Sequence, residues 1–256
     1  MLSYLIYYIN IIVRYFINIL VFTPRKSQNN SYLSTIKNIK INSKNQNLID
    51  VIMCYPKQHY NDNKLIIFSH GNTTINEHQQ EYLSKLSEKL NIPVIGYDYQ
   101  GYGNSGGFSC EQNCYEDHES VIKYVKIVHP KSKIYLMARS LGTGIVIDYI
   151  SKHEWNDPVI LVSPYESMLN IISSYSVIRW VFQNYDLFDS KSKIKNITCP
   201  IKIFHGKDDS LVDISHAQTL YELLSNKKYK PCWLDGCEHK HILDKLPINE
   251  LKEVFE

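Results

Sequence analysis

Short apolar runs alternate with amphipathic segments along most of the chain. Five runs have the length and composition of buried strands, at residues 65–68, 93–97, 134–137, 159–162 and 201–204. Between them, apolar residues recur at helical spacing, as in two clear segments, 77–90 and 115–128. Strands joined by helical crossovers predict an α/β fold, with a mainly parallel sheet covered by helices on both faces.

The flanks of this pattern differ from its centre. Residues 36–41 and 48–54 resemble the two strands of an antiparallel hairpin, and a short strand at 230–234 precedes a final helix from about 241 to 255. We therefore expect one α/β domain over residues 36–256. A polar linker at 23–35 separates it from an N-terminal hydrophobic helix at 1–22.

Residues 1–22 are almost wholly apolar or aromatic, and Arg14 is their only charge. This length suffices to span a bilayer, for which about 20 residues are needed. Polar residues recur at helical spacing, however, so the helix could also lie in the membrane interface or pack on the domain. Arg25 and Lys26 follow the segment, and basic flanks of this kind stay cytoplasmic. We expect membrane association with the α/β domain on the cytoplasmic side, and a soluble cytoplasmic protein as the second choice.

Composition excludes several classes of protein. The 256 residues include 44% hydrophobic and 21% charged residues, which is typical of one soluble globular domain. The net charge is only +2 and the lysines are scattered, so nucleic acid is not an expected partner. Six cysteines show neither zinc-ligand spacing nor the density of a disulfide scaffold. We expect no metal and no organic cofactor.

The most informative motif is Ala-Arg-Ser-Leu-Gly at residues 138–142, directly after a predicted strand and before a predicted helix. A nucleophile elbow lifts its serine on a sharp turn, which requires small residues two positions before and after it. Ala138 and Gly142 meet this requirement, although glycine is more usual at the first position. Ser140 is therefore the predicted nucleophile, and a helix-capping serine is the alternative.

A second loop carries His70, Gly71 and Asn72 after the first central strand. Such His-Gly loops donate one backbone N–H to an oxyanion hole. We assign this donor to Asn72 and the second donor to Leu141, the residue after the nucleophile. For His70 we favour a buried structural role over a chemical one.

The acid and the base are expected near the C-terminus. Asp208 and Asp209 follow the strand at 201–204, and we choose Asp209 because it directly precedes the turn into the next helix. His239 follows a short strand and a glycine turn, which makes it the expected general base, with His241 as its competitor. The order Ser, Asp, His along the chain is that of the α/β-hydrolases.

These motifs make the chain similar to the α/β-hydrolases, and specifically to the α/β-hydrolase-domain protein depalmitoylases and related membrane-anchored serine hydrolases. The matching segments are residues 68–72, 96–106, 138–142, 205–209, 215–216 and 236–239. The resemblance implies a serine esterase or thioesterase, and it implies that the glycine-rich turn at 98–105 is structural. The depalmitoylases carry a cysteine-rich N-terminus, which residues 1–22 replace here.

The expected reaction is hydrolysis of an ester or thioester through an acyl-enzyme formed by Ser140, His239 and Asp209. The substrate would be a small-molecule or lipid-like acyl compound, or an acylated protein. A lid is expected at roughly 163–195, where aromatic residues could line an acyl-binding wall. The alternatives are a catalytically silent binding protein of the same fold, and a lipase or peptidase.

Overall fold

The computed structural model describes residues 2–28, 31–60, 62–173 and 176–256. Its strands are β1 (Ile36–Asn42), β2 (Leu48–Cys54), β3 (Lys64–Ser69), β4 (Val94–Tyr97), β5 (Lys133–Arg139), β6 (Val159–Val162), β7 (Ile201–Gly206) and β8 (Cys232–Leu234). Its α-helices are α1 (Leu2–Val21), α2 (Asn76–Leu90), α3 (Glu111–Val128), α4 (Leu141–Lys152), α5 (Met168–Ile172), α6 (Ser176–Phe182), α7 (Ser190–Ile194), α8 (Ile214–Leu223) and α9 (Ile248–Phe255). Two 3₁₀ helices are η1 (Gln183–Tyr185) and η2 (His239–Lys245).

Within the described residues, the strands form one sheet in the order β1-β2-β4-β3-β5-β6-β7-β8. The hairpin β1–β2 is antiparallel, as expected, and β2 also pairs antiparallel with β4. From β4 to β8 all neighbours are parallel. Parallel strands end at the same edge of a sheet, so the loops that follow β3, β5, β7 and β8 meet there.

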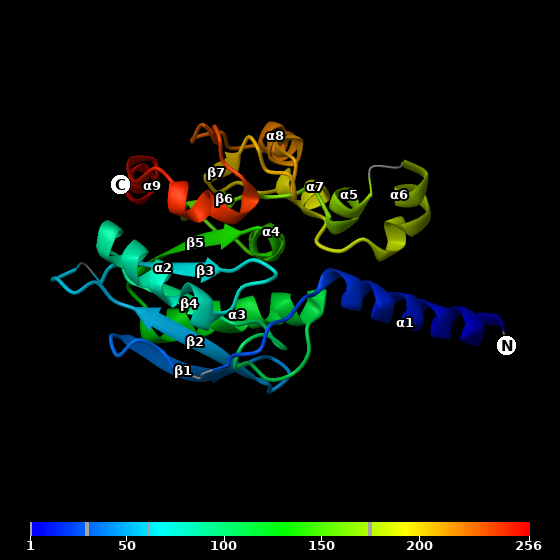
Figure 1. Cartoon of the computed structure of the whole chain (residues 1–256), viewed down its shortest axis with the longest axis horizontal. Helices are drawn as coiled ribbons and strands as arrows, with labels where there is room; N and C mark the ends of the chain where they lie inside the picture. The colour runs from blue at the N-terminus through cyan, green and yellow to red at the C-terminus, as the bar shows by residue number, and fades with distance from the viewer. Residues whose placement is uncertain (1, 29–30, 61, 174–175) are drawn as a thin grey trace.

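Side chains on the parallel strands alternate between two apolar cores. In β3, Leu65 and Ile67 join the core shared with α3, α4 and α8. Ile66 and Phe68 join the core shared with α2 and α9 on the opposite face. The expected α/β architecture with helices on both faces is therefore confirmed (Figure 1).

The N-terminal helix α1 extends away from the sheet and passes below α5 and α6 in the view of Figure 1. Among the described side chains of this segment, Val21 and the following Phe22 are buried in the core, and Ile17 packs against it. The segment expected as a linker is bound to the domain: the Gln28 N–H donates to Glu77 at 3.0 Å and the Leu33 N–H donates to Gln80 at 2.8 Å.

The helix α1 covers most of the segment 1–22 and carries the polar residues Asn10, Arg14 and Asn18. Over the residues described, no helix is both long enough and apolar enough to cross a membrane.

One expectation needs correction. The single final helix from about 241 to 255 is wrong, because the 3₁₀ helix η2 ends before Pro247 and a separate helix α9 follows it.

Candidate active site

Ser140 occupies a strained turn between β5 and α4. Its backbone angles, φ 51° and ψ −120°, lie in a region that side-chain-bearing residues rarely adopt. The turn is held by the Ser140 N–H, which donates to the Val162 carbonyl at 2.9 Å, and by the Thr143 N–H, which donates to the Ser140 carbonyl at 2.8 Å. The Ser140 side chain makes no cap hydrogen bond to any described residue of α4. The helix-capping alternative is therefore not supported.

Close packing explains why small residues occupy positions 138 and 142 of the motif. A Cβ atom at Gly142 would lie 2.3 Å from the Ser69 carbonyl oxygen, so α4 approaches the end of β3 too closely for any other residue. Ala138 lies in β5, in register with Ser69, where a methyl group is fully buried without displacing the backbone. Alanine is consequently tolerated where glycine is usual.

A second close approach positions the loop that carries His239. A Cβ atom at Gly206 would lie 2.0 Å from the Cys237 carbonyl oxygen, so only glycine at the end of β7 lets this loop pack there. The contact is reinforced by the Asp208 N–H, which donates to the same carbonyl at 3.2 Å. The loops after β7 and β8 are thereby brought together.

Ser140, His239 and Asp209 form a continuous hydrogen-bonded chain. The His239 Nδ1 atom lies 2.7 Å from Asp209 Oδ2, and its Nε2 atom lies 3.1 Å from Ser140 Oγ. An ionised carboxylate only accepts, so Nδ1 carries the proton and donates it to Asp209. The Nε2 lone pair is then free to accept the hydroxyl proton of Ser140.

Asp209 is kept ionised by its neighbours. Burial alone would raise the pKa of this carboxyl, but hydrogen bonds from His205 and His239 outweigh burial and hold the pKa well below its usual range. The other oxygen, Oδ1, accepts from the Val212 N–H at 2.8 Å. The side chains of the two competing candidates, Asp208 and His241, are exposed to solvent.

Arg139 is a member of the site that the sequence did not reveal. Its guanidinium donates to the His239 carbonyl at 2.8 Å, and a Cβ atom at Gly71 would lie 2.9 Å from its Nη1. Arg139 thus lies between the base loop and the loop after β3. In the sequence, the position of Arg139 next to Ser140 was the only sign of this role. A sequence position does not show in which direction a side chain points.

The loop after β3 packs against the nucleophile. A Cβ atom at Gly71 would lie 3.5 Å from the Ser140 Cβ. The neighbouring Asn72 side chain turns toward the N-terminal segment, where its Nδ2 donates to the Val21 carbonyl at 2.6 Å and its Oδ1 accepts from the Thr23 N–H at 3.1 Å. Leu141 is the first residue of α4, a position whose N–H has no partner within the helix.

His70 is fully buried beneath this loop. Its Nδ1 lies 2.8 Å from the Gly71 carbonyl, and its ring packs against Tyr99 at a tilt of 36°, with centroids 4.1 Å apart. Burial lowers the pKa of His70 to about 4. The contacts agree with the structural role expected for this residue.

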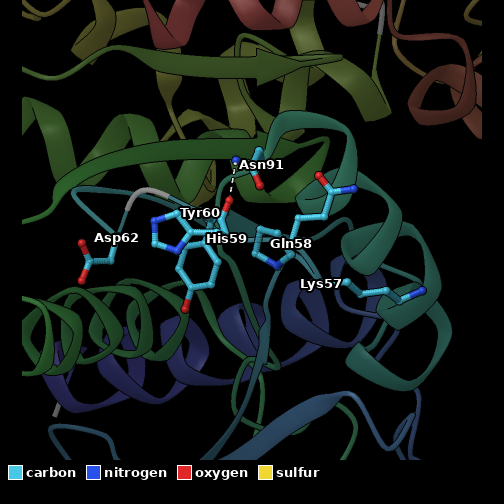
Figure 2. A pocket seen from close by; sticks show the side chains of 7 residues that line it. Lys57, Gln58, His59, Tyr60, Asp62 and Asn91 are labelled. Atoms are coloured by element: carbon cyan, nitrogen blue, oxygen red, sulfur yellow. Dashed lines mark hydrogen bonds between the residues drawn. The ribbon is translucent and has the colours of Figure 1, made fainter.

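A hollow of about 940 Å³ lies at the opposite edge of the sheet, before β3 and β4. Figure 2 shows the side chains around it. It is lined by Pro56, Lys57, Gln58, His59, Tyr60, Asp62 and Asn91. Asn91 donates to the His59 carbonyl at 3.3 Å and closes one side. None of the site residues above reaches this hollow, so we do not count it as part of the candidate active site.

Comparison with known proteins identifies the family of the chain. Residues 61–185 match the family described as serine aminopeptidase, S33. Over 218 residues the chain is 39% identical to an α/β hydrolase of Acanthamoeba polyphaga mimivirus, which covers 84% of this chain and 81% of the viral protein. The chain therefore belongs to the α/β-hydrolase family, as its motifs predicted.

Two further matches compare the length and the fold of the chain with those of known proteins. The chain is 31% identical to alpha/beta hydrolase domain-containing protein 17C of Mus musculus over 194 residues, 75% of this chain and 58% of that protein. It thus spans little more than half of this animal relative. An esterase of Pyrococcus furiosus has the same fold with a TM-score of 0.72 at 19% identity, covering 91% of this chain and 98% of the esterase.

Proposed function

We propose that the protein is a serine hydrolase that cleaves an ester or thioester through an acyl-enzyme. The observation that carries the proposal is the hydrogen-bonded chain from Ser140 through His239 to Asp209, built on the strained turn of Ser140. Ser, His and Asp in this arrangement activate the serine hydroxyl for attack on a carbonyl carbon. The matched structure of Pyrococcus furiosus is named an esterase, which agrees with this class.

In the proposed reaction, His239 Nε2 takes the hydroxyl proton while Ser140 Oγ bonds to the carbonyl carbon of the substrate. The backbone N–H groups of Leu141 and Asn72 hold the resulting oxyanion, and Asp209 stabilises the imidazolium. When the intermediate collapses, His239 returns the proton to the departing alcohol or thiol. Water, activated by the same imidazole, then releases the acid from Ser140.

The alternative of a catalytically silent binding protein requires that the three side chains lie out of reach of one another. The distances of 2.7 and 3.1 Å argue against it. A lipase or peptidase would use the same machinery, and the matched family is described as an aminopeptidase. Parallel assays with acyl esters, acyl thioesters, triglycerides and aminoacyl amides distinguish these substrate classes.

A fluorophosphonate probe, which reacts only with an activated serine, tests the proposal. The wild type should label, Ser140→Ala should not label, and turnover of a reactive ester should fall by about 10⁴-fold or more in Ser140→Ala. Ser151→Ala, at the other end of α4, is the matched control and should label normally. A properly folded wild type that fails to label would contradict the proposed function.

We also propose that the segment between β6 and β7 acts as a lid and that, with α1, it attaches the protein to a membrane surface. Ile12, Phe16 and Trp180 expose 54, 58 and 71% of their surface, a large apolar area for a soluble monomer. The first 49 residues contain six basic and no acidic residues. Such a segment suits an anionic leaflet, and the cytoplasmic leaflet is the anionic one.

Cosedimentation with phosphatidylserine vesicles tests the attachment. The wild type should pellet with these vesicles and much less with phosphatidylcholine vesicles. Ile12→Glu should reduce pelleting several-fold, because the charge must enter the lipid interface. Ile127→Glu, at a still more exposed position on α3, is the control and should behave as wild type. Equal pelleting of Ile12→Glu and wild type would contradict attachment through α1.

A further inference from the structure

An apolar cavity of about 220 Å³ lies between the C-terminal half of α1 and the segment after β6. From α1, it is lined by Ile17, Leu20 and Val21. The facing wall includes Met168 of α5, Phe182 of α6 and Leu187. The cavity is thus formed by two segments that are far apart in the sequence, and neither could form it alone.

A chain of contacts through Val21 and Asn72 connects the wall of the cavity with the candidate active site. Val21 lines the cavity, and its carbonyl accepts the hydrogen bond from Asn72 Nδ2 at 2.6 Å. Asn72 directly follows Gly71, whose Cβ position lies 3.5 Å from the Ser140 Cβ. A chain of direct contacts therefore leads from the nucleophile to the wall of the cavity.

The helical wall is attached to the domain at two points. Near the middle of α1, Asn10 Oδ1 accepts a hydrogen bond from the Tyr185 hydroxyl of η1. Beyond its C-terminal end, the Phe22 ring packs edge-on against Phe188, with centroids 6.0 Å apart. These contacts hold α1 against the segment after β6 and keep the cavity between them.

We propose that this cavity binds the acyl chain of the substrate, so that α1 forms a wall of the substrate-binding site. The inference rests on the proposed function of Ser140. The volume equals roughly seven water-sized groups of about 30 Å³ each, which suits a straight chain of about six to eight carbons. Each buried methylene group then raises kcat/KM about fourfold until the cavity is full.

A groove of about 720 Å³ on the other side of α1 supplies the control. It is lined by Ile19, Tyr15 and Phe108, together with Lys26. Ile17 and Ile19 lie on the same helix but line different hollows. Replacing each by tryptophan adds the same bulk to either side of α1.

The experiment compares p-nitrophenyl esters from acetate to dodecanoate. In wild type, kcat/KM should rise about fourfold per methylene and level off near six to eight carbons. Ile17→Trp should lower the octanoate-to-acetate ratio of kcat/KM at least tenfold, and so should Met168→Trp from the facing wall. Ile19→Trp should leave this ratio unchanged. If only Ile19→Trp lowers the ratio, the acyl chain lies in the other groove and the inference is overturned.

Two further outcomes separate this inference from the proposed function. A wild type that labels with fluorophosphonate but shows a flat chain-length series would overturn the acyl cavity alone. If no labelling and no hydrolysis occur, the proposed function fails, and calorimetry with octanoate still tests the cavity. Octanoate should then bind Ser140→Ala at least tenfold more tightly than the double variant Ser140→Ala/Ile17→Trp. Equal affinities would overturn the inference.

Discussion

The strands around the nucleophile and the N-terminal helix are similarly apolar, yet their environments are opposite. Phe68 at the end of β3 is fully buried, whereas Phe16 and Leu20 of α1 expose 58 and 76% of their surface. The sheet covers β3 with helices on both faces, but α1 leaves the domain and contacts it along one side (Figure 1). Burial is decided by the elements that surround a segment, not by its hydrophobicity.

The buried region around the nucleophile and the exposed helix α1 have different roles in our proposal. The buried region fixes the distances among Ser140, His239 and Asp209, and those distances depend on close backbone contacts at Gly142 and Gly206. The helix α1 contributes exposed apolar surface, which we propose takes part in binding the substrate. We therefore expect substitutions in the buried region to change turnover and folding, and substitutions in α1 to change substrate preference and location.

The largest expected effect concerns the acid in the buried region. Asp209→Asn keeps the shape but replaces the carboxylate that orients His239, so kcat for a reactive ester should fall by about 10⁴-fold. Asp208→Asn alters an exposed neighbour and should stay within a few-fold of wild type. Steady-state kinetics of the two purified variants checks the assignment. An equal loss in both variants, or a loss only in Asp208→Asn, would show that the acid was misassigned.

The next largest expected effect concerns the contribution of buried side chains to the free energy of unfolding. Phe68→Ala removes a fully buried ring from the core shared with α2, which should lower the free energy of unfolding by about 3–5 kcal/mol. Phe16→Ala removes the same ring from the exposed side of α1 and should change it by about 0.5 kcal/mol or less. Denaturant unfolding of both variants measures the contrast. A comparable loss in Phe16→Ala would mean that α1 belongs to the cooperative core.

A smaller effect depends on pH. Burial lowers the pKa of His70 to about 4 from an ordinary value of 6.5, so the unfolded chain takes up a proton there first as the pH falls. The stability that neutral His70 supplies is complete above pH 6.5 and is lost as the pH approaches 4. At pH 5 the loss should be about 2 kcal/mol relative to pH 7.5.

Unfolding free energies at pH 7.5 and pH 5 measure this effect. In His70→Gln the decrease between the two pH values should be smaller than in wild type by that amount. His59→Gln, which removes an exposed imidazole from the hollow in Figure 2, is the control and should keep the decrease of wild type. A decrease in His70→Gln equal to that of wild type would contradict the assignment to His70.

The two regions also differ in how far the sequence predicts them. The strands and the elbow could be predicted because each depends on a local pattern, and Ser140, Asp209 and His239 each follow a strand that ends at the same edge of the sheet. The break before α9 was missed, although Pro247 was a visible signal for it.

Other features depend on contacts between distant segments, which no local pattern encodes. The hydrogen bond from Arg139 to the His239 carbonyl and the contacts of Asn72 with the end of α1 are of this kind. For α1, helical periodicity indicated a helix but not its partner. Its attachment to η1 through Tyr185 became visible only in three dimensions.

The smallest expected effect concerns local unfolding of α1. It tests whether this helix unfolds separately from the domain. Asn10→Ala removes the acceptor for the Tyr185 hydroxyl, a hydrogen bond worth about 1 kcal/mol, so hydrogen exchange within α1 should quicken about fivefold. Exchange in β5 requires unfolding of the sheet. If α1 opens before the sheet unfolds, loss of the Asn10–Tyr185 hydrogen bond should leave the exchange rate in β5 unchanged. Asn18→Ala, the same substitution at another position of α1, is the control. It should leave the exchange rates in α1 and in β5 unaltered. If Asn10→Ala quickens exchange in α1 and β5 together, the helix and the sheet unfold as one unit, and the proposed separation of tasks between them loses its physical basis.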